Sequence, residues 1–92
     1  MNTMFLVLAQ YQGLAVIPIE RVAADYFPHL TASTLIRRVA EGKIDLTITR
    51  IEASQKAARG VHVADLAKYI DTQRELAKKE LDQLHGRYKK AA

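Results

Sequence analysis

The sequence has no cysteine and no tryptophan, and its 92 residues include only two prolines and four glycines. Without cysteine, a disulfide framework, a thiolate metal site and a cysteine nucleophile are all excluded, and the composition suits a reducing compartment. Long apolar runs are also scarce, because the stretch 4–9 is far shorter than a membrane span and lacks the flanks of a secretion signal. We therefore expect a soluble cytoplasmic protein that has no membrane partner and is held together by packing alone.

Residue groupings that would carry catalysis or bind a metal are missing as well. His29, His62 and His85 are far apart and lack carboxylate or thiolate neighbours, so we expect each in a turn, in a cap or on the surface. No Ser/His/Asp set, glycine-rich phosphate loop or paired carboxylate stands out, and so short a chain leaves little room for a water-excluding cleft. The sequence predicts no enzyme, no metal site and no cofactor.

The charge of the chain is unevenly distributed. The chain is long enough for one hydrophobic core, with 49% hydrophobic and 26% charged residues, an ordinary globular balance. Its net charge of +4 divides into −1 over residues 1–30, +3 over 31–62 and +2 over 63–92. A basic middle third favours a polyanionic partner, although charge alone is weak evidence.

The N-terminal segment is ambiguous between helix and strand. Residues 4–11 form either a short helix capped by Thr3 and stopped at Gly13 or a buried strand; we favour the helix and expect the segment in the core. The β-branched group 15–17 then predicts a small strand, and Pro18 suits the first turn of a following helix.

Two short amphipathic helices with a tight turn between them follow. Apolar residues recur every three or four positions over 18–27, and Pro28 ends this helix. The second helix starts at Thr31 and stops at Gly42. On a helical wheel its apolar side holds Leu35, Ile36, Val39 and Ala40. Its opposite, polar side holds Thr34, Arg37, Arg38 and Glu41.

A hairpin and a long closing helix complete the pattern. Alternation of apolar and polar residues predicts a strand over 44–51, and 61–63 returns as a second strand after the polar, basic stretch 52–60. Asp65 then lies in the first turn of a helix from about 64 to about 85. The basic residues of the tail are Arg87, Lys89 and Lys90.

Helix, turn, helix, hairpin and closing helix is the order of a winged helix-turn-helix, an α+β and mostly α fold. We assign this domain to residues 1–80, and a helical extension and basic tail to 81–92. In such a domain the helix 32–41 enters the major groove and the wing 52–60 contacts the backbone. The predicted DNA-binding residues are Ser33, Thr34, Arg37, Arg38, Lys43, Arg50, Ser54, Gln55, Lys56 and Arg59.

Each of these features has a simpler alternative. Arg37 and Arg38 would also serve merely to solvate an amphipathic helix, and the stretch 54–60 would also serve as a soluble turn. The order of the elements favours DNA binding over both. Two rival functions stay open: an architectural, excisionase-like protein that bends DNA, and a protein-interaction regulator of a phage or toxin system.

Several short strings give the chain a family resemblance: Thr3-Met4-Phe5-Leu6, Val16-Ile17-Pro18, Asp25-Tyr26-Phe27, Arg50-Ile51-Glu52-Ala53-Ser54-Gln55-Lys56, Gly60-Val61-His62 and Asp65-Leu66-Ala67. On these strings the chain resembles the pyocin activator protein (PrtN) family, up to the helical tail. The string 50–56 is the most specific, and the others are compatible with many excisionase-like winged helices. The resemblance implies a transcriptional activator that binds double-stranded promoter DNA and switches on phage-tail-like bacteriocin or prophage genes, with RNA polymerase as a candidate second partner.

The closing helix is longer than one small domain needs. Leu66, Ala67 and Ile70 are enough to close the core, yet apolar residues continue at Leu76, Ala77, Leu81, Leu84 and Tyr88. Burying one leucine side chain is worth about 1.5–3 kcal/mol, so we expect a partner for this stripe. We favour a homodimer through the helix over folding of the stripe back onto residues 5–11, and two-fold symmetry would present two recognition helices to two half-sites.

Overall fold

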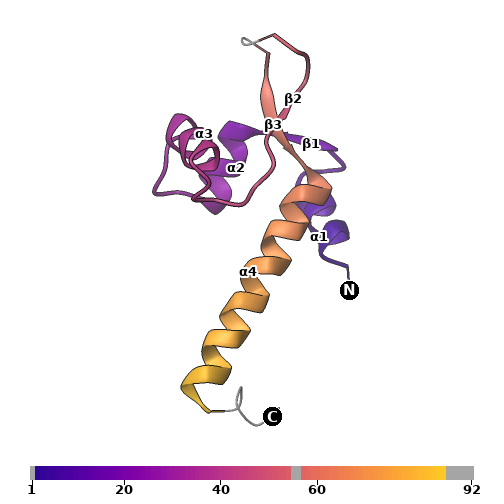
Figure 1. Ribbon diagram of the computed structural model, residues 1–92. Helices are drawn as coiled ribbons and strands as arrows, with labels where there is room; N and C mark the ends of the chain where they lie inside the picture. Colours follow the sequence, from indigo (N-terminus) through magenta and orange to yellow (C-terminus); the bar gives the residue numbers. More distant parts are fainter. Residues whose placement is uncertain (1, 55–56, 87–92) are drawn as a thin grey trace.

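The computed structural model describes residues 2–54 and 57–86, with a small sheet and short helices at one end and one long helix leading away (Figure 1). The elements are α1 (Thr3–Gln10), β1 (Val16–Pro18), α2 (Ile19–Tyr26), α3 (Ala32–Ala40), β2 (Thr49–Arg50), β3 (Arg59–His62) and α4 (Val63–Leu84). The predicted class, α+β with mostly helix and a long C-terminal helix, is confirmed. Within the described residues no helix combines the length and apolar character that a membrane crossing requires.

The three strands form one antiparallel sheet in the order β1-β3-β2. The sequence predicted a strand at 15–17 and a hairpin but did not pair them, and in the structure Ile17 lies opposite Val61. Gly60 of β3 makes this pairing possible: a Cβ there would lie 2.6 Å from the Ile17 carbonyl oxygen. Only glycine allows the two backbones to approach so closely.

The predicted strand 44–51 is mostly wrong, since only Thr49–Arg50 pairs with β3. Its alternation is nevertheless real, because Leu46 is buried while Asp45 and Thr47 are exposed. The backbone instead turns locally, and the Leu46 N–H donates to the Ile44 carbonyl at 3.0 Å. A period of two shows which side chains face the core, but a strand also needs a partner backbone.

The two short helices α2 and α3 form as predicted. Phe27, the residue before Pro28, is the C-cap of α2. The Thr31 hydroxyl caps α3 by accepting the Thr34 N–H at 3.1 Å, and Gly42 adopts a φ of +76° just after the helix. Leu35 is fully buried and anchors α3, whereas the predicted apolar residue Ala40 is exposed.

The first segment is the helix α1, so the helix was the right choice over a buried strand. Its cap, however, is Asn2 rather than Thr3. The Asn2 side chain accepts the Met4 N–H at 2.7 Å. The expectation that the whole segment lies in the core is wrong: Val7 is buried, while Phe5 is 63% exposed and Leu6 is also exposed. Because α1 rests on the rest of the fold by one side only, its other side remains an apolar, uncharged surface.

Polar contacts hold α1 in place. The Tyr11 hydroxyl donates to the Asp25 carboxylate at 2.5 Å, and the Arg21 guanidinium lies 4.8 Å from the centre of the Tyr11 ring. Burial, together with the hydrogen bond to Asp25, raises the pKa of Tyr11 well above its usual value. A second bond, from the Tyr26 hydroxyl to Gln10 at 2.6 Å, also joins α2 to α1. These contacts tie the N-terminal helix to the centre of the fold.

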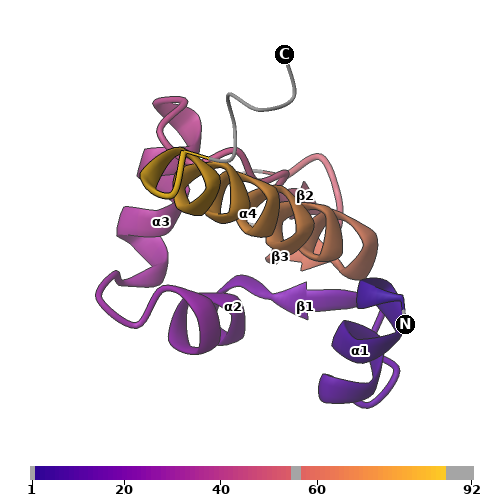
Figure 2. The ribbon, with the colours of Figure 1, turned by 90° about the horizontal axis from the view of Figure 1, so that it is seen from below.

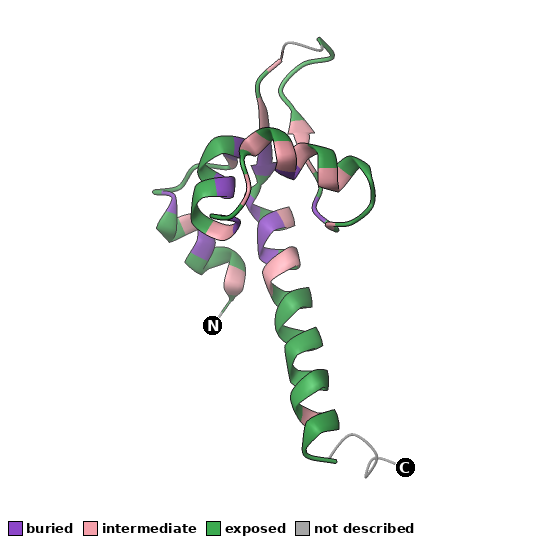
Figure 3. Ribbon diagram, turned by 90° about the vertical axis from the view of Figure 1, so that its left-hand side faces the viewer, coloured by how far each residue is buried: buried purple, intermediate pink, exposed green. Residues whose placement is uncertain are grey.

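The core lies between α2, α3, the sheet and the first turns of α4. Its buried side chains are Val7, Tyr11, Ile17, Ile19, Val22, Ala23, Phe27, Leu35, Leu46, Val61, Val63, Leu66 and Ala67. The predicted closure by Leu66, Ala67 and Ile70 is confirmed, with Ile70 partly buried against this core. Beyond it α4 runs on continuously to Leu84, and Figure 3 shows its lower turns almost wholly exposed.

Candidate nucleic-acid interface

The outer face of α3 presents two of the four residues predicted on it. Ser33 and Arg37 are exposed, whereas Thr34 and Arg38 are half-buried. The Thr34 hydroxyl also accepts a hydrogen bond from Thr31 at 2.9 Å, within the cap of the helix. Arg37 is therefore the best-presented cation of α3, and Thr34 has a structural task that accounts for its presence.

The hairpin places two predicted residues opposite each other. Arg50 of β2 is the register partner of Arg59 of β3. Directly opposed residues of an antiparallel pair project from the same face with Cβ atoms about 5 Å apart, so two positive charges lie side by side. Within the described ranges neither arginine makes an ion pair. Guanidinium groups held near each other on one face repel weakly in water, and a bound anion would relieve that repulsion.

The tip of the hairpin is described only in part. Gln55 and Lys56, both predicted to contact DNA, lie outside the described residues. Ser54 is exposed, and its carbonyl accepts the Ala57 N–H at 3.1 Å, while Ala58 accepts the Ile51 N–H at 3.1 Å. These bonds close the hairpin on both sides of the tip.

One hairpin residue was missed by the sequence analysis. Ile51 follows Arg50 and is 63% exposed, although an isoleucine in a predicted strand is normally assigned to a buried face. Its exposure becomes apparent only once the strand is known to end at Arg50. An apolar side chain beside two arginines is suited to contact a base or sugar rather than a phosphate.

Lys43 differs from the arginines because it already has a partner. Its ammonium lies 3.4 Å from the Glu41 carboxylate, and both side chains are largely solvent-exposed. An exposed pair of this kind is weak, at about 0–1 kcal/mol, yet it offsets the charge that a phosphate would meet. Among the described cations that were predicted to bind DNA, Lys43 is thus the least favourable.

His62, assigned beforehand to a turn, a cap or the surface, is a cap. Its Nδ1 accepts the Ala64 N–H at 3.0 Å and begins α4. This bond explains the position of the histidine at the junction of β3 and α4.

The described residues of the predicted DNA-binding set lie on or next to two elements, α3 and the β2–β3 hairpin. Figure 1 shows α3 and the β2–β3 hairpin at the end of the molecule from which α4 leads away, and Figure 2 shows α1 on the other side of α4 from α3. We call α3 and the hairpin the basic end. Of these residues, Ser33, Thr34, Arg37 and Arg38 lie on α3 and Lys43 follows it, while Arg50, Ser54 and Arg59 lie on the hairpin.

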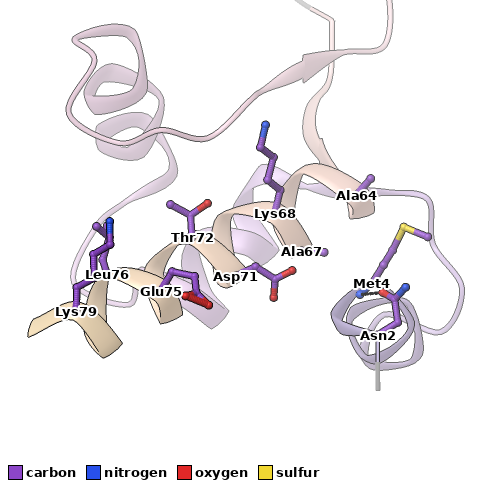
Figure 4. Close-up of a pocket in the computed structure, with 10 residues that line it drawn as sticks. All are labelled: Asn2, Met4, Ala64, Ala67, Lys68, Asp71, Thr72, Glu75, Leu76 and Lys79. Atoms are coloured by element: carbon purple, nitrogen blue, oxygen red, sulfur yellow. Dashed lines mark hydrogen bonds between the residues drawn. The ribbon is translucent and has the colours of Figure 1, made fainter. Parts of the chain in front are cut away.

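A groove of about 530 Å³ lies away from the basic end, between α1 and α4. Figure 4 shows Met4 of α1 beside Ala64 and Ala67 of α4, with Leu76 and Lys79 farther along the helix. Its charged residues are mixed in sign: Lys68, Asp71, Glu75 and Lys79. Such a lining does not favour an anionic ligand, so the groove is not part of the basic surface.

The model of a known protein family matches most of the chain. The family model described as pyocin activator protein PrtN matches residues 3–77, from the start of α1 to the distal part of α4. The chain belongs to the pyocin activator protein PrtN family. Curated proteins and solved structures were compared too, and none matches. The matched range includes the whole basic end.

Proposed function

We propose that this chain is a sequence-specific DNA-binding activator of pyocin or prophage genes, built as a winged helix-turn-helix. In this proposal α3 lies in the major groove of promoter DNA, and the hairpin, as the wing, lies on the phosphate backbone. The observation that carries the proposal is the opposed pair Arg50 and Arg59, two like charges that the fold holds together without an acidic partner in the described residues. Membership in a family of activators supports it.

The roles of the two elements differ. Arg37, on the exposed face of α3, reads a guanine edge, a contact that contributes about 1–3 kcal/mol of discrimination. Arg50 and Arg59 contact phosphates, which adds affinity with little preference for sequence. Ser33 and Ser54, both exposed, donate hydrogen bonds to phosphate oxygens at the two contact regions.

Titration with duplex DNA tests these roles. The specific duplex is one that a footprint near the chain's own gene identifies. We expect Arg37→Ala to weaken binding to this duplex by about tenfold to a hundredfold and to lower the affinity for a scrambled duplex much less. The double variant Arg50→Ala, Arg59→Ala should weaken binding to both duplexes alike. It should also flatten the dependence of log affinity on log salt concentration, because fewer counterions are released.

The matched control is Lys78→Ala with Lys79→Ala, which removes the same two charges from the far part of α4. If this control weakens binding as much as the Arg50 and Arg59 variant, affinity follows net charge alone and the hairpin is not the wing. Unchanged affinity of the Arg37 variant for the footprinted duplex would remove α3 from the major groove.

A second candidate function, DNA bending without activation, has one specific observation in its favour. Ile51 is an exposed apolar residue on the hairpin, and architectural proteins insert such side chains between base steps to kink DNA. Fluorescence transfer between the ends of a bound duplex would report the bend, with Ile51→Ala compared with the parent chain. A reporter fused to the footprinted promoter separates the two functions, because only an activator raises its expression.

A further inference from the structure

The distal segment of α4, residues 73–84, carries an apolar stripe that nothing in the described chain covers. From Ile70 the stripe continues through Arg74, Ala77, Leu81 and Leu84 at spacings of four, three, four and three residues. This is the heptad spacing by which one helix packs along another. Leu81 is 48% exposed and Leu84 is 83% exposed.

We propose that this stripe binds the same stripe on a second copy of the chain. The charges of the distal segment argue for this partner: Arg74, Lys78 and Lys79 balance Glu75, Glu80 and Asp82, so the segment has no net charge. Neither a polyanion nor a polycation is attracted to it. An amphipathic helix of balanced charge is what the surface fits, and a second copy supplies one.

The shape of the molecule permits this pairing. At 1.5 Å per residue, the distal segment extends about 18 Å beyond the core, and Figure 3 shows it exposed on nearly every side. Two copies can therefore pair along it without contact between their cores. The one charged residue in the stripe, Arg74, lies next to the core, where its long stem can cover apolar surface while its guanidinium stays in water.

The groove between α1 and α4 fits a second copy less well. Leu76 points about 100° away from Ala77 around the helix and lines the groove with Met4. The groove is bordered on the α1 side by the hydrogen bond from Thr3 to Asp71 at 2.6 Å, so part of its polar rim is already satisfied. The stripe, in contrast, is the direct continuation of the face that Leu66 and Ile70 turn toward the core.

Leu81→Glu and Leu76→Glu form a matched pair of variants that tests the proposal. The two leucines are about half exposed on the same helix, at 48% and 51%, so either substitution leaves the core intact, which circular dichroism would check. By light scattering, the parent should have twice its chain mass of 10.3 kDa. Leu81→Glu should halve that mass, and Leu76→Glu should leave it unchanged.

Three results would overturn the proposal: a parent of single-chain mass across the concentration range, a dimer that survives Leu81→Glu, or equal dissociation by both variants. Because the chain has no cysteine, introduced thiols give a second, independent measurement. Parallel helices would cross-link Leu84→Cys to itself, and antiparallel helices would cross-link Ala77→Cys to Leu81→Cys. A dimer that forms neither cross-link does not pair along the stripe. Since none of these measurements involves DNA, their failure would leave the proposed function untouched.

Discussion

The two ends of this molecule leave different kinds of surface unsatisfied. At the basic end, Arg37 is exposed on α3 and Arg50 lies opposite Arg59, so the unsatisfied groups are positive charges. On the distal segment of α4 the charges balance, and the unsatisfied groups are the leucine side chains at 81 and 84. Electrostatic attraction acts on the first surface and the hydrophobic effect on the second.

This difference indicates that one part of the chain provides stability and other parts provide binding surfaces. The core between the short helices, the sheet and the first turns of α4 holds the fold, whereas none of the residues 73–84 is buried in the single chain. Substitutions in the core should therefore lower the free energy of unfolding. Equivalent substitutions in the distal segment should not lower the unfolding free energy of the single chain.

The largest effect we expect is that of Leu66→Ala. Leu66 is fully buried in the second turn of α4, and such a truncation costs about 2–5 kcal/mol in unfolding free energy, because it removes apolar contacts and leaves a cavity. Leu76→Ala, ten residues along the same helix, is the control and should cost less than about 0.5 kcal/mol. Denaturant unfolding followed by circular dichroism measures both. Similar losses from the two variants would mean that the distal segment is part of the core.

The next effect is that of an added methyl group at two glycines. Gly60→Ala would place a Cβ 2.6 Å from a backbone oxygen of β1, and we expect it to cost about 1–3 kcal/mol because the sheet must shift. Gly86→Ala, just after α4, meets open space, although its φ of +73° is unfavourable for alanine. Because that end of the helix can fray, the second change should scarcely move the melting temperature. A larger effect at Gly86 would contradict the division between core and distal segment.

A smaller effect concerns alkaline pH, because Tyr11, Tyr26 and Tyr69 all pack in or against the core. Burial raises the pKa of each phenol, so the folded chain keeps protons that the unfolded chain releases above about pH 10. Stability is therefore present below that pH and is lost as the pH rises through it. Tyr11→Phe should cost roughly 1 kcal/mol at neutral pH, through the lost hydrogen bond to Asp25, and should make the alkaline decline shallower. A decline as steep as that of the parent would assign it to other groups.

The sequence predicted the helices well because their signals are local. The cap at Thr31 and the stops at Pro28 and Gly42 act within one turn, and they place α2 and α3 within a residue or two. For α1 the period identified a helix without a clear buried side, and Asn2 is the cap instead of Thr3 because the helix begins at Thr3 and a cap is the residue just before the first helical one.

Features that depend on distant parts of the chain were not predictable in the same way. The alternation over 44–51 does not show which of these residues have a partner strand, so the predicted strand is longer than β2. The opposition of Arg50 and Arg59 depends on the register of the hairpin, which period alone leaves undetermined. The exposure of Ile51 and the close approach at Gly60 follow from the same register.

The smallest effect we expect is a gain in unfolding free energy, opposite in sign to the losses above. It tests whether stability and DNA binding respond differently to one substitution at the basic end. Arg50→Thr removes one of two like charges that face each other across β2 and β3, and threonine favours a strand. We expect the free energy of unfolding to rise by up to about 0.5 kcal/mol in low salt, and the gain to vanish in high salt as the repulsion is screened. DNA affinity should fall in the same variant, because a phosphate contact is lost. Lys79→Gln on the distal segment is the control, since glutamine has a helix propensity close to that of lysine and the change should alter neither DNA affinity nor stability by a comparable amount. If Arg50→Thr destabilised the chain, Arg50 would be part of what holds the hairpin together, and the two arginines would no longer mark a surface kept for a polyanion.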